Sequence, residues 1–122
     1  MTASHKTGED LVAEAKEQIT EVSPEDVVAM QASNEDVVYL DVREPNEWNL
    51  GRIPKAVHLP RGNLESKIEA LVDRGQRVVI YCARGNRSAL AALTLQQMGY
   101  ENVASMARGF GGWVDVSGEI EE

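Results

Sequence analysis

The chain has 122 residues and a formal net charge of −8 at pH 7. This length suits one domain with one hydrophobic core and excludes two. The acidic balance, without a basic stripe that carries aromatic residues, excludes nucleic acid as an expected partner. No apolar run reaches the roughly 18 residues of a membrane span, and the first ten residues lack the apolar stretch of a secretion signal. We therefore expect a soluble cytoplasmic protein with no membrane partner.

The charges are distributed unevenly along the chain. Residues 1–50 contain 12 acidic and 3 basic side chains, whereas residues 52–108 contain 9 basic and 4 acidic ones. The single cysteine, Cys82, lies in the basic segment, as an anion-binding site would if those side chains converge. The alternative is that most of these arginines are simply solvated.

The first predicted element is an amphipathic helix over about residues 8–20. Leu11, Ala15 and Ile19 recur every four residues and would form its apolar face. Because the polar face is acidic, we expect this helix to dock on the protein's own core or on a second copy rather than on an anionic membrane.

The rest of the chain alternates between predicted strands and helices. Ser23 and Pro24 predict an N-cap and first helical position. We expect helices at about residues 24–30, 64–72 and 87–98, a single helical turn at 47–51, and strands at 37–42, 56–60, 77–81 and 103–106. The glycine-rich segment 109–113 and the acidic tail receive no element. This alternation predicts a parallel α/β sheet, in which ligands bind at the carboxyl ends of the strands.

Cys82 lies between the predicted strand 77–81 and the helix that follows it. Such a loop points unpaired backbone N–H groups and the positive end of the helix dipole at one spot, which suits an oxyanion and favours a thiolate over a thiol. Gly85 permits a positive φ, and Arg84 and Arg87 can bind an anionic substrate. A nucleophile inside an anion site suggests covalent catalysis.

Motifs in both halves of the chain resemble a single-domain rhodanese. The front half carries Leu40-Asp41-Val42-Arg43-Glu44-Pro45, Glu47-Trp48, Gly51-Arg52-Ile53-Pro54, and then Ala56, His58, Leu59 and Pro60. The back half carries Tyr81-Cys82, Gly85, Arg87, Ser88, Met98-Gly99-Tyr100, Gly109-Phe110 and Trp113. The matches occur in order over about residues 22–116. The chain departs at Lys55, where the family commonly has glycine, and at Ala107-Arg108-Gly109, which replaces the more usual pair of glycines.

The resemblance implies a rhodanese-like α/β domain over residues 21–122, with a central parallel sheet flanked by helices, and a helical extension over residues 1–20. It implies a sulfurtransferase that moves a sulfane sulfur from thiosulfate or another persulfide-type donor to an acceptor through a Cys82 persulfide, in a ping-pong cycle. The acceptor would be cyanide or a thiol, including a protein thiol. The donor and persulfide would be bound by Ala83, Arg84, Gly85, Asn86, Arg87 and Ser88.

Neighbouring residues receive supporting roles. Asp41 and Arg43 lie at the end of a neighbouring strand, and we expect an ion pair there. Arg87 would either contact substrate or hydrogen-bond the carbonyls of its own loop, and Ser88 would donate to the sulfur. His58 lies in an apolar strand between prolines, which favours a hydrogen-bonded structural histidine over a Cys–His dyad. Two histidines and one cysteine lack the spacing of metal ligands, so we expect no metal and no cofactor.

Two other functions are compatible with the loop. One is a non-catalytic sulfur-carrier or regulatory module that uses the same fold to hold a partner. The other is a cysteine-dependent phosphatase or arsenate reductase, because a cysteine at a helix N-terminus also suits phosphoryl transfer. Those phosphatases have five residues between cysteine and arginine, whereas Cys82 and Arg87 are separated by four. The pattern leaves the oligomeric state open.

Overall fold

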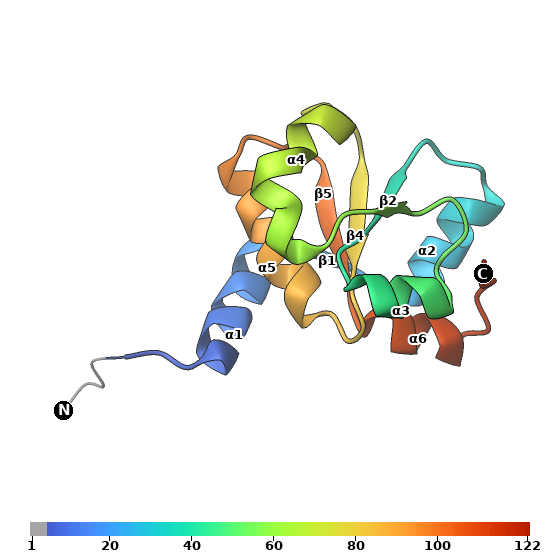
Figure 1. Ribbon diagram of the computed structural model, residues 1–122, viewed down its shortest axis with the longest axis horizontal. Coiled ribbons are helices and arrows are strands. Elements are labelled where there is room, and N and C mark those ends of the chain that lie inside the picture. Colours follow the sequence, from blue (N-terminus) through green and yellow to red (C-terminus); the bar gives the residue numbers. More distant parts are fainter. Residues whose placement is uncertain (1–4) are drawn as a thin grey trace.

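The computed structural model describes residues 5–122 and contains a five-stranded parallel sheet with helices on both faces (Figure 1). The strand order is β1-β5-β4-β2-β3. The strands are β1 (Thr20–Val22), β2 (Val38–Asp41), β3 (Val57–His58), β4 (Val78–Tyr81) and β5 (Val103–Met106). All four residues of β4 are buried, as expected for the central strand of a parallel sheet covered on both faces.

Two groups of helices cover the two faces of the sheet (Figure 1). The helices are α1 (Gly8–Gln18), α2 (Pro24–Ala32), α3 (Pro45–Leu50), α4 (Leu64–Leu71), α5 (Asn86–Gln97) and α6 (Gly109–Asp115), and a short 3₁₀ turn, η1 (Arg61–Asn63), precedes α4. Side chains of α4 and α5 pack into one core, whereas those of α2 and α6 pack into the other. The first helix, α1, lies against α5 on the outside of the first core. No helix among residues 5–122 has the length and apolar character needed to cross a bilayer.

Local capping explains where α2 begins. The Ser23 hydroxyl accepts a hydrogen bond from the Asp26 backbone N–H, and the Asp26 carboxylate accepts one from the Ser23 N–H. These two bonds satisfy N–H groups that the first helical turn leaves free, and Pro24 supplies the first helical φ. The hydrogen bonds also lower the pKa of Asp26. The predicted start of this helix is confirmed.

The N-terminal part of the chain differs from the sequence-based prediction. The first helix ends at Gln18, because Thr20–Val22 forms β1 and pairs in parallel with β5 at the edge of the sheet. Ala15 is fully buried as expected, but Leu11 is exposed. The division between residues 1–20 and 21–122 falls within β1 and stays a prediction.

Two further differences occur later in the chain. The glycine-rich segment after β5 forms α6, although glycine is a poor helix former. Leu71 was expected on the apolar face of the predicted helix 64–72, but it is exposed. The helix α4 ends at Leu71, and the backbone of Val72 is extended, so the Val72 side chain is buried instead. The strands predicted at 77–81 and 103–106 are confirmed as β4 and β5.

Candidate active site

Cys82 directly follows β4, and its sulfur lies inside the turn that begins α5. The side chain is 1% exposed. Its Sγ accepts the backbone N–H of Gly85 at 3.1 Å and that of Ser88 at 3.3 Å. The thiol lies 3.4 Å from the Ser88 hydroxyl oxygen, to which it donates. Two of the expected loop N–H groups therefore point directly at the sulfur, where they favour a negative charge.

Gly85 gives the loop its shape. It is the N-cap of α5 and has φ +95°, in the left-handed region that glycine adopts without strain. A Cβ at this position would lie 3.3 Å from the backbone nitrogen of Arg108 and 3.5 Å from the carbonyl oxygen of Met106. The loop thus packs closely on the turn between β5 and α6, and both its conformation and its surroundings select glycine.

Ser88 belongs to a buried pair of hydroxyl groups. Its Oγ lies 2.8 Å from the Oγ of Ser105 in β5, and both residues are fully buried. When Cys82 is ionised, the Ser88 hydroxyl can donate to the sulfur while accepting from Ser105. Ser105 was not among the residues predicted for the site. The available signal was a serine in an otherwise apolar strand, since a buried hydroxyl needs a hydrogen-bond partner.

The start of α6 holds the outer side of the cysteine loop. The Phe110 N–H donates to the carbonyl oxygen of Cys82 at 2.7 Å, and the Gly111 N–H donates to that of Ala83 at 3.1 Å. Gly109 has φ +55°, and a Cβ there would collide with the Cys82 carbonyl oxygen and with the Ala83 carbonyl group. These bonds fix the two carbonyls on α6. This role of the segment was not predicted, although its three nearby glycines were a signal of close backbone approach.

Asp41 and Arg43 form the expected ion pair at the end of β2. The Arg43 Nη2 lies 2.8 Å from Asp41 Oδ2, and the two side chains are 5% and 0% exposed. The same nitrogen donates to the carbonyl oxygen of Gly51 at 2.7 Å. The guanidinium also lies 4.4 Å from the centre of the Phe110 ring. This pair therefore joins β2, the end of α3 and α6 beside the cysteine loop.

Arg87 has a partner that the sequence analysis did not identify. Its guanidinium makes two hydrogen bonds to the Glu47 carboxylate of α3, from Nη1 to Oε1 at 2.8 Å and from Nη2 to Oε2 at 3.1 Å. This pairing lowers the pKa of Glu47 to about 2. No local pattern connects these positions, which are 40 residues apart. Of the two loop arginines, Arg84 is exposed and has no ion-pair partner among residues 5–122.

The remaining candidates lie around this centre. Asn86 is exposed in the first turn of α5, and Ala83 is half-buried. His58 Nε2 hydrogen-bonds to the carbonyl oxygen of Arg43 at 2.9 Å, and its ring stacks on Trp48. The hydrogen-bonded structural histidine is thus present. Within the described part of the chain, no three His, Cys, Asp or Glu side chains are grouped to hold a metal ion.

Comparison with known proteins shows to which family this fold belongs. The model of the Rhodanese-like domain family matches residues 23–115. The chain belongs to this family. The sheet and the six helices of residues 5–122 form a rhodanese-like fold. A protein of unknown function from Rhodopseudomonas palustris, described as a possible tyrosine phosphatase, superposes with a TM-score of 0.87. That structure is 36% identical, and the match covers 99% of this chain and 98% of the other.

Curated rhodanese relatives point to sulfur chemistry. A sulfurtransferase of Allochromatium vinosum is 34% identical over 95 residues, which cover 78% of this chain and 88% of the relative. YrkF of Bacillus subtilis, provisionally named a sulfur carrier protein, is 32% identical over 108 residues. That match covers 88% of this chain, and it spans only 58% of YrkF. The chain is thus a member of a sulfurtransferase family.

Proposed function

We propose that this protein transfers a sulfane sulfur through a persulfide on Cys82, with thiosulfate or another persulfide-type donor. The observation that carries the proposal is the position of Sγ, which accepts two backbone N–H groups at 3.1 and 3.3 Å and faces the Ser88 hydroxyl. These donors are fixed by β4, Gly85 and the start of α5 before any substrate arrives. A thiolate and the negative charge of a persulfide are stabilised by such fixed donors without reorganisation.

The first half-reaction loads the cysteine. The Cys82 thiolate attacks the outer sulfur of thiosulfate, a new S–S bond forms, and the old S–S bond breaks. Sulfite leaves with the electron pair of that bond, and the enzyme holds Cys82-S-S⁻. The exposed guanidinium of Arg84 orients the sulfonate, because Arg87 is held by Glu47.

The second half-reaction unloads the cysteine. An acceptor thiolate or cyanide attacks the outer sulfur of the persulfide, and the S–S bond to Cys82 breaks. The electron pair of that bond returns to Cys82 as thiolate, while the acceptor leaves as a persulfide or as thiocyanate. With one cysteine in these 122 residues, the sulfur passes to an outside acceptor rather than to a second thiol of this chain.

Intact mass spectrometry of the non-reduced protein tests this cycle. Incubation with thiosulfate, polysulfide or glutathione persulfide should add about 32 Da, and washing followed by cyanide or glutathione should remove it. The Cys82→Ser variant keeps a side chain of similar size and should fold but gain no mass. Absence of a mass gain with all three donors, or a gain on the serine variant, would exclude the mechanism.

Phosphatase chemistry is the second candidate, favoured by the description of the Rhodopseudomonas relative. Two features oppose it. The loop has four residues between Cys82 and Arg87, and the Arg87 guanidinium is engaged by Glu47, where a phosphate ester would need it. Hydrolysis of p-nitrophenyl phosphate that is lost in Cys82→Ser would support this candidate.

The second half-reaction distinguishes a sulfur carrier from a sulfurtransferase. A carrier would hold the persulfide in the presence of cyanide and glutathione and release it only to a protein thiol. Release of the added mass to either small acceptor supports the transferase.

A further inference from the structure

We propose that Ser105 is a positioning residue for Cys82: its buried hydroxyl holds the Ser88 hydroxyl so that Ser88 donates a hydrogen bond to the sulfur when the sulfur is anionic. The inference rests on the function proposed above, in which Cys82 attacks the donor as a thiolate and later leaves the persulfide as a thiolate. Both steps place negative charge on Sγ. Ser105 therefore acts on both half-reactions without contacting substrate.

The sheet brings Ser105 to the cysteine loop. Ser105 lies in β5 and pairs in register with Ile80 of β4, two residues before Cys82. Ile80 and Cys82 both belong to the core beneath α4 and α5, as does Val103, which lies on the same face of β5 as Ser105 because side chains alternate along a strand. Ser105 thus faces the start of α5, where its hydroxyl meets that of Ser88.

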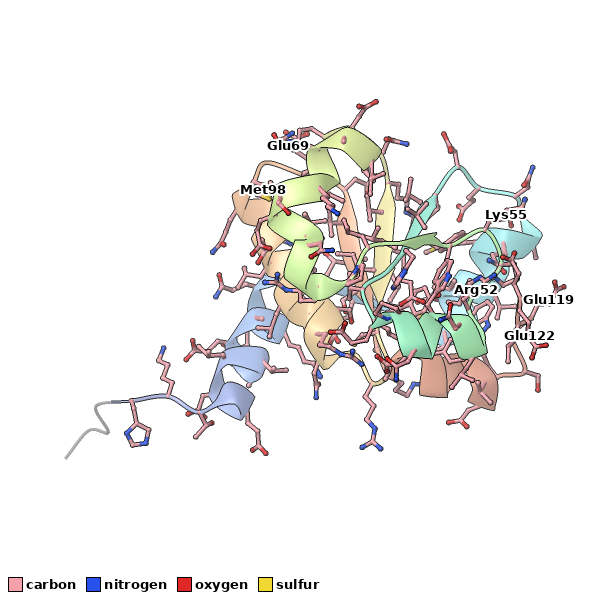
Figure 2. All side chains as sticks on the ribbon, in the orientation of Figure 1. Arg52, Lys55, Glu69, Met98, Glu119 and Glu122 are labelled. Carbon is pink, nitrogen blue, oxygen red and sulfur yellow. The ribbon has the colours of Figure 1, made fainter. Side chains whose placement is uncertain are left out.

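The hydroxyl groups of Ser88 and Ser105 lie in the interior of the protein. Both residues are 0% exposed, and their Oγ atoms are 2.8 Å apart. The strands β4 and β5 are buried throughout, whereas charged side chains such as those of Glu69 and Glu122 lie at the surface (Figure 2). A buried hydroxyl opposes folding unless it is hydrogen-bonded, and alanine would occupy this strand without that requirement. The serine in β5 therefore points to a role for its hydroxyl.

The direction of these hydrogen bonds depends on the charge of the sulfur. As a thiol, Cys82 donates to Ser88 Oγ at 3.4 Å, so the hydrogens of three groups share two contacts and one of them is left over. As a thiolate, Cys82 accepts from Ser88 while Ser88 accepts from Ser105, and both hydroxyl hydrogens are used. Hydrogen bonds that run in one direction strengthen each other, so the chain of two hydroxyls favours the anionic sulfur.

Ser105 also determines where the Ser88 hydroxyl points. Ser88 lies in the first turn of α5, and a serine in a helix can rotate to hydrogen-bond a carbonyl oxygen of the preceding turn. The 2.8 Å contact with Ser105 holds Ser88 Oγ beside Sγ instead. The N–H groups of Gly85 and Ser88 that also reach Sγ belong to the backbone of the loop and do not depend on Ser105. Ser105 thus controls one of the three donors to the sulfur.

The charged groups around the cysteine are separate from this hydroxyl pair. They are Arg84 in the loop, Arg87 of α5, Glu47 of α3, Asp41 and Arg43 at the end of β2, and Arg108 at the N-cap of α6. The charged side chains of α4 are exposed, and β4 and β5 contain one titratable group, Tyr81, whose pKa is raised by burial so that it stays neutral. A substitution at Ser105 leaves all these groups in place.

Ultraviolet absorption of the thiolate tests the role of Ser105 without any sulfur donor. A thiolate absorbs in the far ultraviolet where a thiol does not, and Cys82 is the single cysteine of the 122 residues. Titration of the reduced chain with pH, with Cys82→Ser as the blank, gives the midpoint of ionisation. The midpoint should lie about 0.5–1 pH unit higher in Ser105→Ala, because the anion loses a positioned donor. An unchanged midpoint in folded Ser105→Ala overturns the proposal.

Threonine and valine at position 105 separate the hydroxyl from packing. Both side chains are β-branched and differ by a hydroxyl in place of a methyl group, so the effect of added bulk is common to both. Ser105→Thr should keep the native midpoint, whereas Ser105→Val should raise it as Ser105→Ala does. Thermal unfolding checks that the variants fold. Equal midpoints in the threonine and valine variants would assign the effect to packing and overturn the proposal.

A double variant shows whether Ser105 acts through Ser88. Adding Ser105→Ala to Ser88→Ala should leave the midpoint of Ser88→Ala unchanged, because no hydroxyl remains to be positioned. Shifts that simply add would overturn the proposal. In the loading experiment, Ser105→Ala should gain mass from thiosulfate about two- to tenfold more slowly than the native chain. If the native chain gained no mass with any donor, the proposed function would fail, while the titration would still decide the role of Ser105.

Discussion

The cysteine loop and the surroundings of Tyr39 each contain a buried polar atom, but only the atom in the loop is hydrogen-bonded. In the loop, Sγ of Cys82 receives two backbone N–H groups and faces a hydroxyl. The Tyr39 hydroxyl has no partner within residues 5–122. The first arrangement prepares an atom for negative charge before substrate arrives. The second leaves a buried donor without a hydrogen bond, which costs the folded state stability.

The largest expected effect comes from the ion pair that supports the loop. Asp41→Asn should lower the free energy of unfolding by about 3–5 kcal/mol, because it leaves the buried Arg43 guanidinium without its counter-charge. Urea denaturation measures this loss. The control is Glu65→Gln, which removes the exposed pair with Arg61 and should cost less than about 1 kcal/mol. Equal losses in the two variants would contradict the supporting role of Asp41.

Gly109→Ala should have the next largest effect. Its Cβ would collide with the carbonyl groups of Cys82 and Ala83 at a left-handed φ, so we expect a loss of about 2–4 kcal/mol and slower sulfur transfer. Gly111→Ala is the matched control. Its Cβ would lie 3.6 Å from the Ala83 carbonyl oxygen, an ordinary contact, and stability should change by less than about 1 kcal/mol. Thermal unfolding and sulfur-transfer assays compare the two variants. If Gly109→Ala kept the stability and transfer rate of the native chain, α6 would not shape the loop.

The Glu47–Arg87 pair should make the free energy of unfolding depend on pH. The pKa of Glu47 is about 2 in the folded protein and near its ordinary value of 4.5 in the unfolded chain. Its contribution is therefore fully present above about pH 4.5 and is lost as the pH falls towards 2. The difference in urea midpoint between the native chain and Glu47→Gln should shrink from pH 6 to pH 3. A difference that stays constant over this range would contradict the pairing.

The Glu47→Gln variant also tests how the sulfur donor binds. Glu47→Gln frees Arg87 to bind an anion, so the KM for thiosulfate should fall by about tenfold or less. An unchanged KM would show that Glu47 does not compete with the donor.

The smallest effect is expected at the rim of the pocket beside Tyr39. Lys55 has φ +69° where glycine would be unstrained, so Lys55→Gly should change stability by no more than about 1 kcal/mol and in the stabilising direction. Sulfur transfer should be unchanged, because Lys55 lines this pocket and not the loop. Differential scanning calorimetry and the transfer assay test both parts, and a loss of transfer would show that the two regions are coupled.

Much of the cysteine loop could be predicted from consecutive residues. Cys82 follows an apolar strand, Gly85 permits the turn, and α5 begins directly afterwards, so the position of Cys82 depends on local conformation. The capped start of α2 is similarly local, because Ser23 and Asp26 bond to each other's backbone. The sequence by itself therefore determined the alternation of strands and helices, the place of Cys82 and the loop around it.

The tertiary structure decided the features that join distant segments. β1 is three residues long and exists through its pairing with β5, and α6 forms despite its glycines because its first N–H groups bind the cysteine loop. Glu47 reaches Arg87, and Ser88 reaches Ser105, only when the sheet brings α3, α5 and β5 together. The pocket beside Tyr39 is lined by three separate parts of the chain, within residues 28–39, 54–55 and 113–119. Such contacts follow from packing across the fold, and no periodicity or spacing along the chain encodes them.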